Sequence, residues 1–158
     1  MKKFRLLAQV LVFVLVLSAC GTDAKPTRLG TSAFSIVLPD GYAFADDEFD
    51  EDQVAYYYKD DNSIDFDVYQ WEKGDQYTLE SEANAFAHVY GTVPEAVVIN
   101  GINGMKYVSE EEYEGAVYTV VNYMFEDDAY IVELCFWTID TAEEYAAVDE
   151  ILGTLKKN

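Results

Sequence analysis

Three strand-like runs in the second half of the chain, joined by very short turns, constrain its fold more than any other feature. The runs cover residues 104–112, 117–125 and 130–139, and the connections between them are Glu114-Gly115 and the acidic stretch 126–128. Turns this short join neighbouring antiparallel strands. The three runs therefore predict an antiparallel meander.

The first half of the chain also predicts strands. Residues 34–38 alternate between apolar and polar at first and then stop at Pro39-Asp40-Gly41, which has the backbone preferences of a tight turn. A tyrosine-rich strand is expected over residues 54–59, and a turn leads from it to a strand over residues 64–71. Apolar residues occupy one face of this last strand, and the other face carries Asp65, Asp67, Tyr69 and Trp71.

A first helix is predicted where the spacing of apolar residues changes from two to three or four. The positions at this spacing are Leu79, Ala83, Phe86, Ala87 and Tyr90. Thr78 is suited to cap the N-terminus of the helix, and Gly91 and Pro94 are suited to end it.

A second helix is predicted after the meander. Thr141 and Glu144 have the spacing of a capping box, and the apolar stripe behind them extends to Leu155. Lys156 and Lys157 come next, at the helix end where the helix dipole favours cations. The order strands, helix, strands, helix predicts an α+β fold, an antiparallel β-sheet flanked by helices.

The N-terminus has the features of an export signal. Three basic residues among the first five precede a short apolar stretch over residues 6–17, and Ser18-Ala19 comes directly before Cys20. The stretch is well short of the roughly 20 apolar residues that span a bilayer. The arrangement resembles a bacterial lipoprotein signal, which implies that Cys20 is acylated and becomes the mature N-terminus. An uncleaved N-terminal anchor helix is the alternative.

This signal predicts both the domain boundaries and the location. Residues 1–19 would be the signal peptide, residues 20–31 a lipidated flexible tether, and residues 32–158 the domain. We expect the protein to be lipid-anchored at the extracytoplasmic face of a bacterial membrane. Cys135 then remains as a single thiol in an apolar run, where we expect it to be buried and inert.

The charge of the chain narrows the classes of partner. The formal net charge is -20 at pH 7. Such a surface repels nucleic acid and anionic lipid head groups, so neither is an expected partner apart from the lipid anchor itself. The negative charge fits a cationic partner. The alternative is that the charge serves only to keep the protein soluble.

Three short segments resemble PsbP-like and DcrB-like domains. They are the opening strand and turn over residues 34–42, the Asn100-Gly101 turn that leads into the meander, and the C-terminal residues 151–156. The resemblance covers most of residues 33–157 and implies a central antiparallel sheet flanked by helices. It also implies kinship with small extracytoplasmic lipoproteins of unassigned activity and with photosynthetic accessory subunits, and it specifies no functional residue.

A candidate ligand site lies on the polar face of the strand over residues 64–71. Asp65, Tyr69 and Trp71 share this face, and tyrosines of the preceding strand lie beside them. Carboxylates next to aromatic rings are suited to a small cationic or sugar ligand. The alternative is that a helix covers Tyr69 and Trp71 and that the acids lie at the rim of the sheet.

A candidate metal site lies in the acidic loop before residue 54. Asp46, Glu48, Asp50 and Asp52 offer oxygen ligands of the kind that calcium takes. The loop lacks the spacing of an EF-hand, so any calcium site there would be weak, and a solvated acidic loop is the alternative.

Catalytic motifs are sparse. His88, the single histidine, has no carboxylate at helical spacing, and it and Cys135 have no zinc-site spacing. The sequence therefore predicts a non-enzymatic binding or accessory module without a cofactor, whose partner is an envelope protein or a small cationic or sugar ligand. Two alternatives remain, a calcium-responsive acidic module and a hydrolase that uses a pair of carboxylates.

Overall fold

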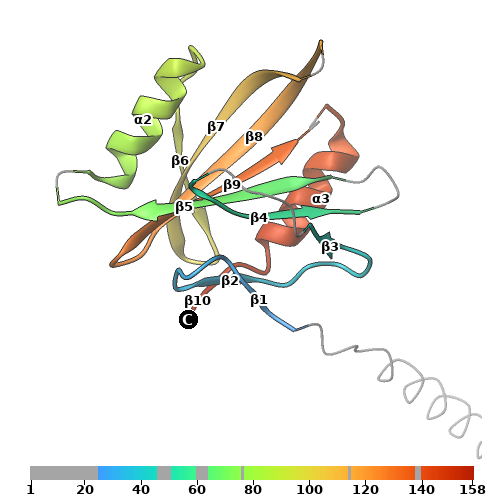
Figure 1. Ribbon diagram of the computed structural model, residues 1–158, viewed down its shortest axis with the longest axis horizontal. Helices are drawn as coiled ribbons and strands as arrows, with labels where there is room; N and C mark the ends of the chain where they lie inside the picture. Colours follow the sequence, from blue (N-terminus) through green and yellow to red (C-terminus); the bar gives the residue numbers. More distant parts are fainter. Residues whose placement is uncertain (1–24, 46–50, 60–63, 76, 114, 138–139) are drawn as a thin grey trace, which may run out of the picture.

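The computed structural model describes residues 25–158 apart from 46–50, 60–63, 76, 114 and 138–139. Among these residues, the largest element is a seven-stranded sheet in which every neighbouring pair is antiparallel (Figure 1). In spatial order its strands are β3 (Ala43–Phe44), β4 (Gln53–Tyr58), β5 (Phe66–Glu72), β9 (Tyr130–Trp137), β8 (Ala116–Glu126), β7 (Ile102–Tyr113) and β6 (Glu95–Ile99). The predicted α+β class is confirmed.

The predicted meander forms three of the seven strands of this sheet, β7, β8 and β9. β7 pairs with β8 from Gly104–Phe125 to Tyr113–Ala116, and β8 pairs with β9 along its second half. The turn from β6 into β7 has positive φ at both Asn100 (52°) and Gly101 (78°). This combination suits the two-residue turn that joins twisted antiparallel strands, so the predicted Asn-Gly turn is confirmed.

A small second sheet closes one side of the domain. It is formed by β1 (Thr27–Arg28), β2 (Phe34–Ile36) and β10 (Lys156–Lys157), with β2 in the centre. Leu29 is fully buried in the main core. Residues 27–29 of the segment that was predicted to be the tether are therefore part of the folded domain.

Asp127, in the turn between β8 and β9, connects the two sheets. Its Oδ2 accepts a hydrogen bond from the backbone N–H of Ala33 (2.7 Å), and its Oδ1 accepts from the N–H groups of Ala129 and Tyr130. Burial acts to raise the pKa of Asp127, but these backbone donors outweigh it and the pKa is lowered.

The two faces of the large sheet carry separate cores. On one face, α3 (Ala142–Leu152) and the small sheet enclose the larger core, to which Phe34, Phe66, Phe125 and Phe136 contribute fully buried rings. On the other face, α2 (Leu79–Val89) encloses a smaller core over Met124 and Ile131. α2 packs mainly on β7 and β8, so it covers only part of its face.

The helix caps agree with the sequence, but one helix end does not. Thr78 and Thr141 are the N-caps, and each forms a capping box with the residue three positions later. The last helix ends at Leu152, so the prediction that it extends to Lys156 and Lys157 is wrong. Gly153 ends the helix, and the two lysines instead pair with Ser35 and Phe34 of β2. Neither described helix is long and apolar enough to cross a membrane.

Candidate ligand-binding groove

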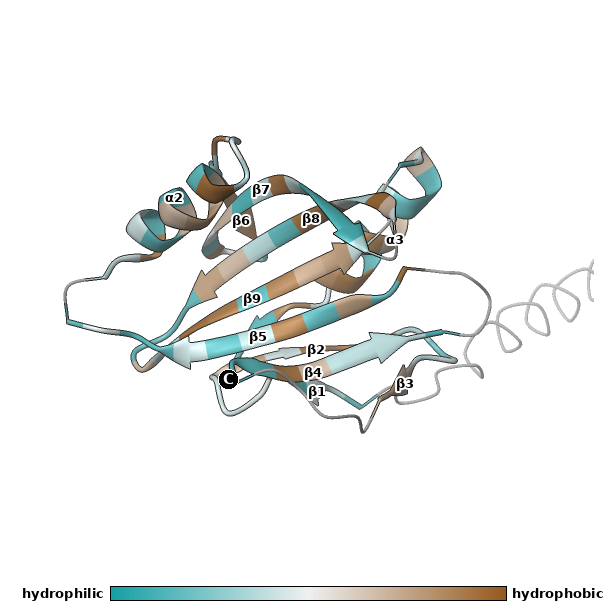
Figure 2. Cartoon of the chain, turned by 45° about the horizontal axis from the view of Figure 1, so that its top comes forward, coloured by the Kyte–Doolittle hydropathy of each residue, from teal (hydrophilic) through white to brown (hydrophobic). Residues whose placement is uncertain are grey.

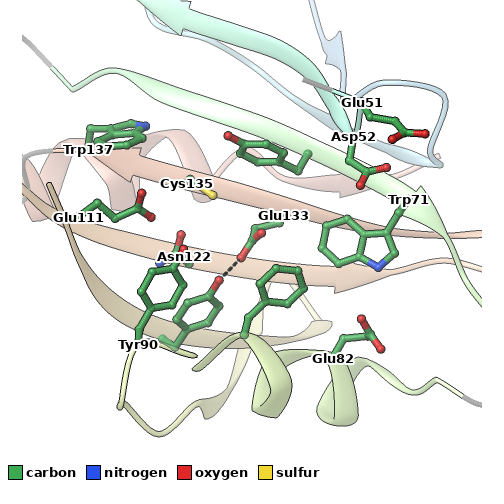
Figure 3. Close-up of a pocket in the computed structure, with 13 residues that line it drawn as sticks. Glu51, Asp52, Trp71, Glu82, Tyr90, Glu111, Asn122, Glu133, Cys135 and Trp137 are labelled. Carbon is green, nitrogen blue, oxygen red and sulfur yellow. Dashed lines mark hydrogen bonds between the residues drawn. The ribbon is translucent and has the colours of Figure 1, made fainter. Parts of the chain in front are cut away.

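A groove of about 610 Å³ lies on the face of the sheet that carries α2 (Figure 3). Its lining comes from β5, β7, β8, β9, α2 and its C-cap, and the turn before β4. Because α2 packs mainly on β7 and β8, the part of the face formed by β5 and β9 stays open beside the helix. The volume lies in the range of about 300–1,000 Å³ that is typical of small-molecule sites.

Strand alternation explains which side chains reach the groove. On β5, Phe66 and Val68 point into the main core, and Tyr69 and Trp71 point to the other face. Hydrophobic and hydrophilic bands alternate at the start of β5 (Figure 2). On β9 the same parity brings Glu133, Cys135 and Trp137 into the groove.

Glu133 lies at the floor of the groove and is only 4% exposed. The hydroxyl of Tyr107 on β7 donates a hydrogen bond of 2.5 Å to its Oε1 (Figure 3). Burial raises the pKa of Glu133 to about 7, and the hydrogen bond from Tyr107 opposes that shift. The hydrogen-bond donor to Glu133 is thus a neutral hydroxyl, and the nearby carboxylate of Glu111 adds to the rise of the pKa.

A second buried carboxylate fixes the ring of Trp137. The indole Nε1–H of Trp137 donates to Oδ2 of Asp67, and the side-chain amide of Gln53 donates to Oδ1. Burial raises the pKa of Asp67 to about 6, although both donors favour its ionised form. Asp67 thus holds Trp137 in place at the end of the groove.

Aromatic rings form much of the groove wall. Trp71 packs against Phe86 of α2 with ring centroids 5.5 Å apart, and Tyr90 stacks on Tyr107 at 6.2 Å. Burial raises the pKa of Tyr90 to about 12, and the nearby carboxylate of Glu111 adds to the shift. Together, these rings offer flat apolar surface with electron-rich faces, to which cations are attracted.

The charged residues of the lining are all acidic. Among the described residues that line the groove there are five carboxylates and no Lys, Arg or His. The five are Glu51, Asp52, Glu82, Glu111 and Glu133. Such a cavity concentrates negative potential between low-dielectric walls and attracts cations.

Two of the three residues predicted for the ligand site lie in this groove. Tyr69 and Trp71 line it, and Trp71 is only partly buried beneath α2. Asp65 does not line it, because its carboxylate accepts hydrogen bonds from the Tyr56 hydroxyl (2.9 Å) and the Lys59 backbone N–H. The assignment of Tyr69 and Trp71 to a ligand remains a prediction.

The predicted metal site falls largely outside the described residues. Asp46, Glu48 and Asp50 lie in the segment that the structure does not describe, and Asp52 is at the rim of the groove. In the described part of the chain, no three residues of metal-ligating type are grouped for an ion. A calcium role for the acidic loop stays a prediction.

Cys135 is buried in β9, as the sequence predicted. Burial, with the adjacent Glu133 carboxylate adding to it, raises the pKa of the thiol, so it stays protonated. His88 lies on the exposed side of α2 and is absent from the groove lining. Neither residue is placed as a nucleophile or a general base.

Comparison with known proteins supports the fold. No protein-family model matches the chain, and no curated protein matches it in sequence. Among solved structures, the cyanobacterial PsbP (CyanoP) of Synechocystis sp. PCC 6803 is similar at a TM-score of 0.60 and 11% identity, over 90% of this chain and 99% of that one. The chain has a PsbP-like fold.

Two further structures share this PsbP-like fold. LpqN of Mycobacterium tuberculosis, which is involved in cell envelope biogenesis, is 14% identical with a TM-score of 0.56, over 87% of this chain and 86% of its own. A protein of Bacteroides thetaiotaomicron VPI-5482 is 17% identical with a TM-score of 0.59, over 83% of this chain. The chain spans about half the length of that protein (49%). At these identities the likeness extends to the fold alone.

Proposed function

We propose that the chain is a non-enzymatic binding module at the extracytoplasmic face of a bacterial membrane, and that its groove binds a small cationic ligand. The observation that carries this proposal is the composition of the groove, in which the described lining places five carboxylates and six aromatic side chains around a cavity of about 610 Å³. Acidic groups provide attraction for a cation, and the rings provide contact area.

The proposed location rests on the N-terminal signal and is supported by a protein of similar fold. The basic start, short apolar stretch and Cys20 match a lipoprotein signal. LpqN, which has a similar fold, is involved in biogenesis of the cell envelope. The N-terminal signal and the likeness to LpqN are also compatible with an accessory role beside another envelope protein. In that role, a ligand bound in the groove would regulate how this chain acts on its partner protein.

Labelling with an alkyne analogue of palmitate tests the anchor. We expect the full-length chain to incorporate the label in a bacterial host and to fractionate with membranes. The Cys20→Ala variant is expected to lose the label, whereas Cys135→Ala, which changes a buried thiol in the domain, is expected to keep it. Absence of label on the unaltered chain would refute the lipid anchor.

Tryptophan fluorescence tests the cation site directly, because both tryptophans of the chain, Trp71 and Trp137, line the groove. We expect the emission to change and to saturate on titration with organic ammonium ions, tested as n-butylamine, tetramethylammonium and 1,4-diaminobutane. Glucose, acetate and calcium serve as neutral, anionic and metal probes. A saturating response to glucose or acetate alone would contradict a cation site.

A hydrolase is the second candidate, and one observation favours it. Glu133 is a buried carboxyl with a raised pKa, as an acid catalyst requires, and Glu111 lines the same groove. Against it, Glu133 is 4% exposed and already bonded to Tyr107, so its proton is poorly placed for transfer to a substrate. Release of 4-nitrophenol from a panel of 4-nitrophenyl glycosides, abolished by Glu133→Gln, would favour the hydrolase.

A further inference from the structure

We propose that the groove selects a linear aliphatic diamine or polyamine, a methylene chain that carries ammonium groups at a distance from each other, over compact or singly charged cations. This inference rests on the proposed function of the groove as a cation site. It is drawn from how charge and apolar surface are distributed along the groove.

The carboxylates lie at both ends of the groove. Figure 3 shows Glu111 at one end, near Tyr90 and Trp137, and Glu82 at the other end, near Trp71. Glu51 and Asp52 lie on the same side as Trp71, above Glu82 in this view. A compact cation can satisfy only one of these ends, whereas two ammonium groups joined by a chain can satisfy both.

The wall of the groove on the α2 side suits methylene groups. Trp71 with Phe86 and Tyr90 with Tyr107 form two ring pairs along the α2 side. A methylene chain packed against such rings is removed from water, which stabilises the complex by about 0.8 kcal/mol per buried methylene. Ammonium groups beside the ring faces gain further attraction.

Glu133 provides an independent indication of a positive ligand. It lies at the floor between the two ends, and no described cation lines the groove beside it (Figure 3). A buried carboxylate is destabilising unless an opposite charge accompanies it, and such buried groups ordinarily have a partner. Glu133 is 4% exposed and bonded to Tyr107, so an ammonium group in the groove above it acts on this charge through space and offsets part of its cost.

A metal ion fits this arrangement less well. Hard cations require six or more oxygens converging on one point. Here Glu111 and Glu82 lie at opposite ends of the groove, and the described residues contain no group of three metal-ligating side chains suited to an ion. The spread of the acids matches an extended ligand instead.

The proposal is tested with the full-length chain purified in detergent, at about 150 mM NaCl to screen diffuse attraction to the acidic surface. The probes are 1,4-diaminobutane, spermidine, n-butylamine, tetramethylammonium and a trilysine peptide, followed by tryptophan fluorescence and calorimetry. We expect spermidine to bind at least about ten-fold more tightly than n-butylamine, since its further charges add charge-assisted contacts, and we expect the shorter 1,4-diaminobutane to fall between them.

Variants at the two ends sharpen the test. Glu111→Gln and Glu82→Gln each remove one terminal charge and are expected to reduce the preference for spermidine over n-butylamine to about two-fold or less. Glu110→Gln is the matched control, because Glu110 is the exposed neighbour of Glu111 on β7 and points to the opposite face. It is expected to leave the preference unchanged, and thermal melts verify that all three variants fold.

The outcomes separate the inference from the proposed function. If n-butylamine or tetramethylammonium binds as tightly as spermidine, the groove is a cation site without length selection, and the inference is refuted while the function stands. If no amine gives a saturating signal, both are refuted. If trilysine binds and no free polyamine does, the ligand is a basic protein segment and the inference is refuted. Equal loss in Glu110→Gln and Glu111→Gln would also refute it.

Discussion

The substitution Glu133→Gln removes a charge from the floor of the groove with little change of shape. Glu133 is 4% exposed, and its Oε1 accepts the hydrogen bond of the Tyr107 hydroxyl. The amide oxygen of glutamine accepts the same hydrogen bond, so packing is kept while the charge is lost. The variant therefore isolates the free energy that the buried charge costs the ligand-free protein.

The size and the sign of the effect follow from the pKa. Burial raises the pKa of Glu133 from 4.5 to about 7, so the folded protein binds this proton more tightly than the unfolded chain does. Ionisation of Glu133 thus opposes folding fully above about pH 7, and the effect disappears below about pH 4.5. At about 1.36 kcal/mol per pKa unit, Glu133→Gln is expected to raise the free energy of unfolding by about 3 kcal/mol at pH 8.

Urea unfolding of the ligand-free protein, at several pH values between about 4.5 and 8, measures this effect. We expect the difference between Glu133→Gln and the unaltered chain to grow with pH across this interval. Glu110→Gln, at an exposed site on β7, is expected to show no such growth. Destabilisation of Glu133→Gln at pH 8, or a difference that is the same at every pH, would refute the assignment of Glu133 as a buried, uncompensated charge.

Three further substitutions test other parts of the structure. Tyr107→Phe removes the hydroxyl that donates to Glu133. In urea unfolding, we expect it to lower the free energy of unfolding by about 1–3 kcal/mol at pH 8 and by less at pH 4.5. Equal losses at both pH values would contradict a hydrogen bond to an ionised Glu133. Gly104→Ala places a Cβ 2.6 Å from Cε1 of Phe125, so we expect a loss of about 1–3 kcal/mol in denaturant unfolding, and unchanged stability would contradict the close packing of β7 on β8. Asp127→Asn weakens a carboxylate that accepts hydrogen bonds from three backbone N–H groups, so we expect the free energy of unfolding to fall by about 2 kcal/mol at pH 7. Because the pKa of Asp127 is lowered in the folded protein, its stabilising contribution is present above about pH 4 and is lost as the pH falls further, so the difference between variant and unaltered chain should shrink at pH 2–3. A difference that does not depend on pH would contradict this account of Asp127.

Much of the fold could be predicted because its signals are local. The Asn100-Gly101 turn, the N-cap at Thr78 and the capping box at Thr141 depend on residues only a few positions apart, and each is found where the sequence indicated it. β1 and β10 were missed because a strand of two residues carries no periodic pattern. They form only through long-range pairing with β2, which also ends the last helix before Lys156.

The groove could be predicted only in part, for a similar reason. The alternation of β5 placed Tyr69 and Trp71 on one face correctly, because alternation is a property of a single strand. Glu133 and Trp137 follow the same alternation on β9, but their position opposite β5 depends on a register that the sequence does not state. The contribution of α2 depends on its lying over β7 and β8, which leaves β5 and β9 open.

The central claim is that the groove, rather than the acidic surface as a whole, is the site for a cationic ligand. A titration with spermidine at about 150 mM NaCl, followed by proton–nitrogen NMR, tests it most directly. The account predicts that the indole N–H signals of Trp71 and Trp137 shift and saturate together, while backbone signals of Asp149 and Glu150 on the exposed side of α3 do not move. Shifts that spread over α3 without saturation, with unmoved indole signals, would contradict it.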